Sequence, residues 1–243
     1  MRVFGLIGKS LEHSFSKEYF TRKFESDGID AVYRNFEFEK VEDIRPFIDD
    51  LDGVVGLNVT IPYKEKIIPF LDDIEESAKE IGAVNTIVIQ NNKWVGYNTD
   101  QYGFMTSLKP FLSNKHERAL ILGSGGASRA IQYALKGMSI VSHVVAREKG
   151  SADLTYEELN NHVIEACKLI INTTPLGMFP NLDESPTIPY EFIAKEHLVY
   201  DLIYNPEKTQ FLMRAEERGA SIMNGIDMLR LQAEKAWEIW NTH

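Results

Sequence analysis

Short apolar runs alternate with amphipathic stretches along almost the whole chain, and this pattern limits the folds open to it. In the first half, apolar runs at 3–8, 33–38 and 54–61 are separated by helical patterns at 16–27 and 41–51. Strand, helix and strand in succession require crossover connections, which are right-handed and build a mostly parallel sheet. The pattern therefore predicts an α/β fold in which helices cover the faces of the sheets.

The same alternation continues to the end of the chain. We expect a helix at 74–81 closed by Gly82, a hairpin pairing 86–89 with 94–97, and four further strands at 119–122, 140–145, 169–172 and 198–203. Helical patterns are expected at 102–112, 128–135, 207–218 and, last, 225–243. We divide the chain into an N-terminal α/β substrate domain, 1–101, and a Rossmann-type dinucleotide domain, 102–224. The C-terminal helix, 225–243, is expected to return to the first domain and complete it.

Composition excludes several classes of protein. The 243 residues are 44% hydrophobic and 26% charged, which is ordinary for a soluble globular protein. A net charge of −10 argues against a nucleic-acid partner, although local cations could still bind a small anion. The apolar start at 1–8 is too short for a signal peptide, and the other runs are too short to span a membrane. We therefore expect a cytoplasmic protein with no membrane partner.

The single cysteine, Cys167, excludes an internal disulfide. It lies just before the apolar run 169–172, as a small buried residue would. The alternative, a catalytic nucleophile, has no evident partner in the sequence.

A glycine-rich turn, 123–127, follows the apolar strand 119–122 and precedes a helix. Gly123 and Gly125 occupy the first two positions of a Rossmann fingerprint, where glycines allow a tight turn and close approach of a pyrophosphate. The third position, normally glycine or alanine, is Ser128. A dinucleotide site is indicated, with a plain strand-to-helix turn as the alternative.

The end of the next strand carries both signs of charge. Arginine at this place favours the 2′-phosphate of NADP, and an acid favours the ribose hydroxyl of NAD. Arg147 and Lys149 supply positive charge, and Glu148 opposes them. A solvated charged turn is the alternative here.

Polar residues after the strand at 54–61 point to acid–base chemistry. Lys64 follows Pro62, which must end the strand, and Asp100 closes the polar run 98–100. A lysine beside a carboxylate can deliver a proton to a carbonyl oxygen as hydride arrives at carbon. Ser14 and Ser16 would present two hydroxyls on one side of an extended segment, or else cap a helix.

With these motifs in place, the chain resembles the shikimate dehydrogenase family over essentially its whole length. The matching pieces, in order, are 14–16, 58–64, 81–86, 96–100, 123–127, 172–178, 200–206 and 225–232. The resemblance implies reversible NADPH-dependent reduction of 3-dehydroshikimate to shikimate, in the biosynthesis of chorismate and the aromatic amino acids.

The resemblance also implies roles for single residues. Lys64 and Asp100 would bracket the reacting oxygen. Ser14 and Ser16, helped by Tyr204, would hold the substrate carboxylate, and Thr60, Asn85 and Gln232 would contact the hydroxyls or the ring. Around NADP, the residues implied are Gly123, Ser124, Gly125, Gly126 and Ala127 at the pyrophosphate, Arg147 and Lys149 at the 2′-phosphate, and Thr173, Thr174, Pro175, Leu202 and Gly225 along the nicotinamide half. No metal is implied, and the assembly would be a monomer or a homodimer.

Departures from the family pattern keep alternatives open. The usual Asn-Arg-Thr at the second strand end is Ala146-Arg147-Glu148, which leaves the strictness of NADP preference undecided. Lys17 and Gln101 replace a common proline and glycine. The rivals are a quinate/shikimate dehydrogenase that prefers NAD, a methylene-tetrahydrofolate dehydrogenase-like enzyme, against which the paired serines argue, and a non-catalytic nucleotide-sensing protein on the same fold.

Overall fold

The computed structural model describes residues 1–12, 14–150 and 152–242. The chain divides into a first compact unit, Met1–Thr99 with Ala233–His243, and a second, Asp100–Gln232. The boundaries predicted from the sequence lie two residues later at the first junction and eight residues earlier at the last. Asp100 and Gln232, predicted in the first domain, group instead with the second unit.

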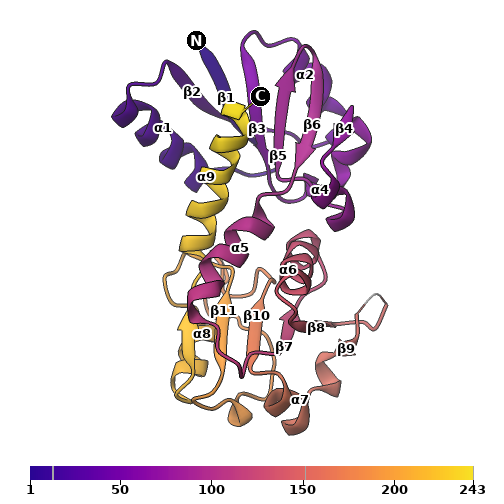
Figure 1. Cartoon of the computed structure of the whole chain (residues 1–243), viewed down its shortest axis with the longest axis vertical. Coiled ribbons are helices and arrows are strands. Elements are labelled where there is room, and N and C mark those ends of the chain that lie inside the picture. Colours follow the sequence, from indigo (N-terminus) through magenta and orange to yellow (C-terminus); the bar gives the residue numbers. More distant parts are fainter. Residues whose placement is uncertain (13, 151, 243) are drawn as a thin grey trace. The chain divides into compact units, whose positions relative to one another are not determined.

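The first unit is built on a mixed sheet with strand order β2-β1-β3-β5-β6-β4 (Figure 1). Its strands are β1 Arg2–Gly8, β2 Ala31–Glu37, β3 Val54–Val59, β4 Asp73–Ile74, β5 Thr86–Gln90 and β6 Lys93–Tyr97. Its helical elements are α1 Phe15–Asp27, η1 Val41–Asp43, α2 Ile44–Asp49, α3 Tyr63–Lys66, η2 Ile68–Phe70 and α4 Glu76–Ile81. The expected helices before Gly28 and Gly82 are confirmed, since both end at those glycines.

The predicted hairpin is confirmed. β5 and β6 pair antiparallel, with Gln90 opposite Lys93 across a two-residue loop. Asn91 and Asn92 in that loop have φ of 52° and 59°, values that asparagine tolerates better than most residues. Two positive φ angles give the turn type whose twist suits a hairpin.

Each face of the first sheet has its own core. One core joins the strands to α2, α3 and α4 through Ile44, Ile48, Tyr63 and Ala78. On the other face, Phe20 and Phe24 of α1 pack with Phe4, Val88 and Trp240. Trp240 also donates its indole N–H to the carbonyl of Ile87, 3.0 Å away. The expectation that the C-terminal helix, α9 Ile226–Thr242, returns to the first domain is confirmed for its second half.

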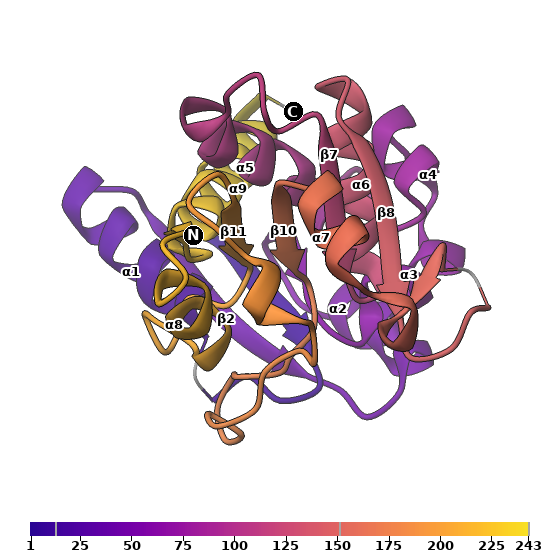
Figure 2. The same ribbon diagram turned by 90° about the horizontal axis from the view of Figure 1, so that it is seen from below.

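The second unit is a Rossmann-type domain with strand order β12-β11-β10-β7-β8-β9, parallel throughout its recorded pairings. Figure 2 shows the four central strands, β11, β10, β7 and β8, in this order. Its strands are β7 Arg118–Leu122, β8 Val141–Ala146, β9 Leu154–Thr155, β10 Leu169–Asn172, β11 Leu198–Asp201 and β12 Ser221–Met223. Its other elements, besides the start of α9, are α5 Asp100–Leu108, η3 Lys109–Phe111, α6 Gly126–Gly137, η4 Tyr156–Glu158, α7 Asn161–Ala166, η5 Tyr190–Phe192 and α8 Gln210–Glu216. The α/β class predicted from the sequence is confirmed.

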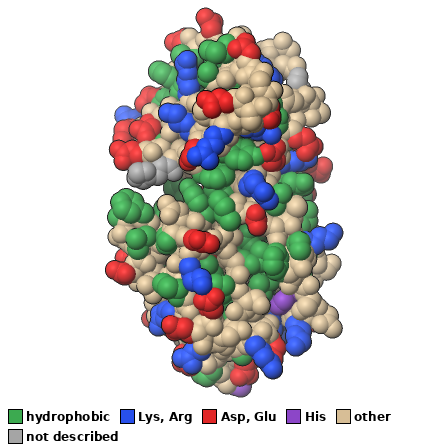
Figure 3. Space-filling model, turned by 90° about the vertical axis from the view of Figure 1, so that its left-hand side faces the viewer, with side chains coloured by type: hydrophobic (Ala, Val, Ile, Leu, Met, Phe, Trp, Pro, Cys, Tyr) green, Lys and Arg blue, Asp and Glu red, His purple; other side chains and the backbone are tan. Residues whose placement is uncertain are grey.

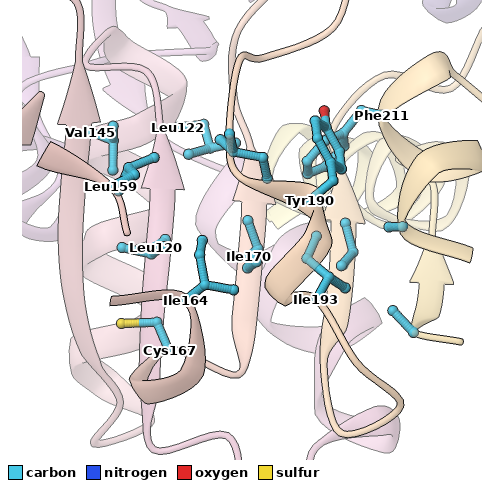
Figure 4. Packing of buried hydrophobic residues seen from close by; sticks show 14 of the residues in the cluster. Leu120, Leu122, Val145, Leu159, Ile164, Cys167, Ile170, Tyr190, Ile193 and Phe211 are labelled. Carbon is cyan, nitrogen blue, oxygen red and sulfur yellow. The ribbon is translucent and has the colours of Figure 1, made fainter. Parts of the chain in front are cut away.

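Successive residues of β7 face opposite sides of this sheet. Leu120 and Leu122 join a core with α7, η5 and α8, which Figure 4 shows from close by. Ala119 and Ile121 face α5 and α6 instead. Cys167 points into the first of these cores, 3% exposed, and burial raises the pKa of its thiol. The interpretation of Cys167 as a small buried residue is therefore confirmed.

Several expected elements are shorter than the pattern indicated. The strand expected at 54–61 ends at Val59, because Thr60 accepts a turn hydrogen bond from Tyr63 N–H, 2.9 Å away. The helix expected at 102–112 begins at Asp100 and ends at Leu108, before Pro110. The helix at 207–218 is limited to Gln210–Glu216, where Thr209 caps its first turn.

The surface carries both signs of charge. Figure 3 shows Lys and Arg side chains interspersed with Asp and Glu over the face in view, although the net charge is −10. Within the described ranges, no helix is long and apolar enough to cross a membrane.

Candidate active site

Polar side chains of the first unit gather at one edge of its sheet. β5 runs antiparallel to β3, and β6 antiparallel to β5, with Thr86 opposite both Asn58 and Tyr97. The end of β3, the start of β5 and the end of β6 therefore meet at the same edge. This register brings together polar residues that lie far apart in the sequence, namely Asn58, Thr60, Asn85, Thr86, Asn98 and Thr99.

Five of these residues, Asn58, Asn85, Thr86, Asn98 and Thr99, are buried with their amides and hydroxyls hydrogen-bonded, whereas Thr60 is half-buried. Asn85 accepts from Thr99 N–H at 2.7 Å, and its Nδ2 lies 3.0 Å from Thr99 Oγ1. Asn58 Nδ2 lies 3.2 Å from Thr86 Oγ1 and 3.3 Å from the carbonyl of Asn85. Asn98 donates to the carbonyl of Ala83 at 2.9 Å. Such a network holds Asn85 in one orientation, since a buried amide that loses its partners costs free energy.

A tyrosine that the sequence analysis did not single out completes this network. The Tyr33 hydroxyl donates to Asn58 Oδ1 at 2.8 Å and is hydrogen-bonded to Ser16. Burial raises the pKa of Tyr33, so it stays protonated. Tyr33 is a buried position of β2 between half-buried Val32 and exposed Arg34, and this local pattern carries no sign of the contact with Asn58.

The two serines do not lie together on an extended segment. Ser14 is the N-cap of α1 and accepts from Lys17 N–H at 3.2 Å, which confirms the capping alternative. Ser16 lies in the first turn of α1 and is 8% exposed.

Lys64 lies in α3, directly after the turn at 60–62 that follows β3. Its carbonyl accepts from Val84 N–H at 2.7 Å, which fixes the lysine backbone beside the segment that leads to Asn85. Asp100 is the first residue of α5 in the second unit and is 6% exposed. Because the two residues belong to different units, their pairing stays a prediction.

The glycine-rich turn of the second unit has the geometry that a pyrophosphate needs. Gly123 has φ of +108°, and a Cβ there would meet Thr173 Oγ1 at 2.7 Å. Gly125 is the N-cap of α6, and a Cβ there would meet no atom within 4 Å. The space beside Gly125 is therefore open, at a helix N-terminus that favours anions. Ser124 lies in the turn, Gly126 and Ala127 begin α6, and the third fingerprint residue, Ser128, is fully buried in the first turn of that helix.

Lys149, one of the two cations after β8, is already paired with a carboxylate. Arg147 and Glu148 are exposed. Lys149 Nζ lies 2.6 Å from Glu158 Oε1, while Glu158 Oε2 accepts from Thr155 N–H at 2.8 Å. This pairing was not visible in the sequence, because it depends on the parallel pairing of β9 with β8.

The predicted nicotinamide residues lie around a second buried network, at the ends of β10 and β11. Asn172 Oδ1 accepts from the N–H and hydroxyl of Thr174, at 3.0 and 2.7 Å. Asn172 Nδ2 donates to Asp201 Oδ1 at 3.0 Å. The Thr173 hydroxyl donates to the carbonyl of Leu122 at 2.8 Å. The loop that contains Pro175 is thus held to β7 and β11.

The loop after β11 is held by the same carboxylate. Asp201 Oδ1 also accepts from Ile203 N–H at 3.1 Å, and Oδ2 accepts from the Thr209 hydroxyl at 2.6 Å. Gly225 packs so closely that a Cβ there would lie 2.0 Å from the carbonyl oxygen of Leu202, which explains this glycine. The sequence analysis did not assign Asn172 or Asp201, although each is a polar residue that ends an apolar strand.

The remaining predicted substrate residues belong to the second unit. Tyr204 is half-buried, and burial raises its pKa. Gln232 is 7% exposed in α9, and its Nε2 donates to the carbonyl of Leu229 at 3.0 Å. In the described parts of the chain, no group of three His, Cys, Asp or Glu side chains could hold a metal ion.

Comparison with known proteins agrees with this arrangement. Residues 6–87 match the family model of the shikimate dehydrogenase substrate binding domain. A shikimate dehydrogenase (NADP(+)) from Caldicellulosiruptor saccharolyticus is 40% identical, over 99% of this chain and 92% of that protein. This chain belongs to the shikimate dehydrogenase family.

Solved structures of the shikimate dehydrogenase family share the fold over the whole chain. The enzyme of Thermus thermophilus, in complex with NADP(H) and shikimate, matches with a TM-score of 0.89 and 28% identity, covering 100% of this chain and 94% of that one. A quinate dehydrogenase from Corynebacterium glutamicum in complex with NAD matches with a TM-score of 0.88, 28% identity and the same coverage. The fold is therefore common to members that were solved with different cofactors.

Proposed function

We propose that this chain catalyses the reversible NADPH-dependent reduction of 3-dehydroshikimate to shikimate, a step of aromatic amino-acid biosynthesis. The proposal rests on the overlap between the family match and the polar edge of the first sheet. The family model of the substrate binding domain covers residues 6–87, and this stretch contains Asn58, Thr60 and Asn85 of the buried polar edge. The relatives named shikimate dehydrogenase (NADP(+)) support the same reaction over nearly the full chain.

The neutral polar edge suits a substrate that carries several hydroxyl groups. Amide and hydroxyl side chains both donate and accept, so they pair with hydroxyls without burying an unpaired charge. We assign the hydroxyls and ring to Thr60, Asn85 and Gln232. The substrate carboxylate is assigned to Ser14, Ser16 and Tyr204.

Lys64 and Asp100 are proposed as the acid–base pair. In the reducing direction the Lys64 ammonium gives a proton to the substrate oxygen and steadies the charge that develops there. In the oxidising direction Asp100 would accept a hydrogen bond from the reacting hydroxyl of shikimate and orient it. The oxidation of shikimate reverses these proton movements.

The glycine turn is proposed to hold NADPH, which supplies the hydride when bound. Backbone N–H groups at the start of α6 would bind the pyrophosphate, in the open space beside Gly125. Arg147 would pair with the 2′-phosphate, since its planar fork matches phosphate oxygens. Thr173, Thr174, Pro175, Leu202 and Gly225 would line the nicotinamide half.

A second candidate, an NAD-preferring quinate/shikimate dehydrogenase, is favoured by the charges after β8. Glu148 lies next to Arg147, and Lys149 is paired with Glu158 at 2.6 Å. Both features lower the positive charge that is free to meet a 2′-phosphate. The structural relative named quinate dehydrogenase was solved with NAD.

Initial rates with shikimate or quinate, each with NADP⁺ or NAD⁺, test the two candidates. We expect the highest kcat/KM for shikimate with NADP⁺. A higher kcat/KM with NAD⁺ and quinate would select the second candidate. No turnover in any combination, with NADP⁺ still bound, would indicate a nucleotide-sensing protein instead.

Two further properties are proposed from the reaction and the chain. NADPH chemistry and the unpaired Cys167 thiol favour a reducing compartment, and we place the activity in the cytoplasm. We propose a monomer or a homodimer, which light scattering on the purified protein would distinguish from larger assemblies.

A further inference from the structure

Asp201 is a fully buried carboxylate at the carboxyl end of β11. Its hydrogen bonds come from neutral donors: Asn172 Nδ2 at 3.0 Å, Ile203 N–H at 3.1 Å and the Thr209 hydroxyl at 2.6 Å. Among the residues that the structure describes, no ion pair includes Asp201. A buried carboxylate normally pairs with a cation, so an unpaired one calls for a reason.

The charged and titratable groups on the surrounding elements are engaged elsewhere. Burial raises the pKa of Tyr190 of η5, with a smaller contribution from the Asp201 charge, and the Tyr190 hydroxyl donates to the carbonyl of Pro186 at 2.8 Å. Arg214 of α8 lies 4.1 Å from the centre of the Tyr190 ring and donates to Ser185.

Two further groups near these elements are not partners of Asp201. Lys208 pairs with Glu216 at 2.8 Å. Burial raises the pKa of Tyr200, and the charge of Asp227, at the start of α9, adds to this rise. Asp227 itself pairs with Arg230 at 3.3 Å. The negative charge of Asp201 is therefore held by hydrogen bonds alone.

The position of Asp201 relative to the dinucleotide follows from the strand order. In a Rossmann domain the pyrophosphate lies at the first glycine turn, after β7, and the adenosine ribose lies at the end of the next strand, β8. β10 and β11 lie on the opposite side of β7 from β8. The nicotinamide half then lies over the ends of β10 and β11, where Asp201 is next to Leu202. This step rests on the proposed function.

The nicotinamide ring gains one positive charge when it gives up hydride, whereas the substrate keeps the same charge. A fixed negative charge in a dry site interacts with that positive charge more strongly than it would in water. We propose that the Asp201 carboxylate favours NADP⁺ over NADPH in this site, and so assists the departure of hydride from the cofactor. Through Asn172 it also positions the loop at 173–176.

The charge of Asp201 is expected to depend on pH in the working range. Burial, opposed by its three hydrogen bonds, raises the pKa of Asp201 from 3.8 to about 6. The carboxylate is charged above that pH and neutral below it. The preference for NADP⁺ should therefore decline as the pH falls below about 6.

Asp201→Asn removes the charge and keeps the shape. The new Oδ1 can accept from Asn172 and Ile203, and the new Nδ2 can donate to Thr209 Oγ1. The Kd of NADP⁺ and of NADPH would be measured by calorimetry at pH 7.5. We expect the ratio of Kd for NADP⁺ to Kd for NADPH to rise by about tenfold. This is the order of magnitude that Coulomb's law gives for the attraction between two unit charges at the effective dielectric constant of a protein site.

Thr209→Ser is the matched control, because it keeps the hydroxyl that donates to Asp201 and keeps the charge, while it alters the packing beside the carboxylate. The ratio should stay unchanged in this variant even if both Kd values rise. Equal weakening of both cofactors in Asp201→Asn, with an unchanged ratio, would show that Asp201 has only a structural role and would overturn the proposal.

The unmodified protein gives an independent test if Asp201→Asn does not fold. The ratio of the two Kd values would be compared at pH 5.2 and pH 7.5. The 2′-phosphate also titrates near pH 6, but it is common to both cofactor forms and cancels in the ratio. A ratio independent of pH would overturn the proposal, and failure to bind either form would overturn the proposed NADP function as well.

Discussion

The buried polar edges of the two units are built differently. In the first unit, Asn58, Asn85 and Thr99 form a network of amides and hydroxyls that carries no net charge. In the second, Asn172 and Thr209 donate to the Asp201 carboxylate. The proposed reaction changes the charge of the cofactor and not that of the substrate. Under the two proposals, the comparison teaches that the cofactor, whose charge changes, lies near a buried carboxylate, while the hydroxyls of the substrate meet amide and hydroxyl side chains.

The largest expected effect comes from the ionisable group beside the neutral edge. Lys64→Ala should lower kcat by about two to four orders of magnitude, because the proton donor is lost. The fold should persist, since the variant keeps the backbone carbonyl of residue 64 that accepts from Val84 N–H. Initial rates and circular dichroism of the purified variant check both statements.

Lys66→Ala is the matched control for Lys64→Ala. Lys66 is exposed and lies two residues further along α3. Its replacement should leave the rate near that of the unmodified protein. Near-normal turnover in Lys64→Ala would contradict the acid–base assignment.

Asp100→Asn tests whether the carboxylate of Asp100, a residue of the second unit, acts on the substrate. We expect kcat to fall by about two orders of magnitude, because a neutral amide orients the reacting hydroxyl poorly. The Kd of NADP⁺, titrated by fluorescence, should change much less. Unchanged turnover together with lost NADP⁺ binding would mean that Asp100 belongs to the cofactor site.

The charged edge should cost stability in a pH-dependent way. The folded-state pKa of Asp201 is raised from 3.8 to about 6, so the folded state binds this proton more tightly than the unfolded chain does. The resulting contribution of Asp201 to the free energy of unfolding is fully present below pH 3.8 and is lost as the pH rises through 6. Asp201→Asn should gain up to about 3 kcal/mol relative to the unmodified protein between pH 4 and pH 7. Urea unfolding of both proteins across this range measures the difference.

Two histidines act in the opposite direction and cancel in that difference. Burial lowers the pKa of His116 and His197 in the folded state. The contribution of these histidines to the free energy of unfolding is therefore present above pH 6.5 and is lost as the pH falls. Both proteins contain these histidines, and subtraction isolates Asp201. A difference that is constant with pH would contradict the raised pKa of Asp201.

The smallest expected effects concern the 2′-phosphate. Arg147→Ala should lower kcat/KM for NADP⁺ by about tenfold or more and that for NAD⁺ far less, because a charged hydrogen-bond partner of the phosphate is lost. Glu148→Thr should raise kcat/KM for NADP⁺ by only a few-fold, since exposed charges interact weakly. Specificity constants for both cofactors decide the matter. An equal loss for both in Arg147→Ala would place the 2′-phosphate site elsewhere.

Local patterns in the sequence were enough for much of the fold. The alternation of apolar runs predicted both sheets, and the turn residues predicted the ends of α1 and α4 and the hairpin at Asn91 and Asn92. These features depend on neighbours a few residues apart, so the sequence displays them directly. The glycine turn was readable for the same reason, because Gly123 and Gly125 lie together between a strand and a helix.

Only the tertiary structure decided how distant polar residues combine. Tyr33 and Asn58 meet because β2 and β3 flank β1, and Lys149 meets Glu158 because β9 pairs with β8. The charge state of Asp201 depends on complete burial, which comes from every element packed around it. By itself, the sequence determined the family, the α/β class and the candidate residues. Strand register and burial, which arise from contacts across the chain, decided which of those residues touch and which of them are easily ionised.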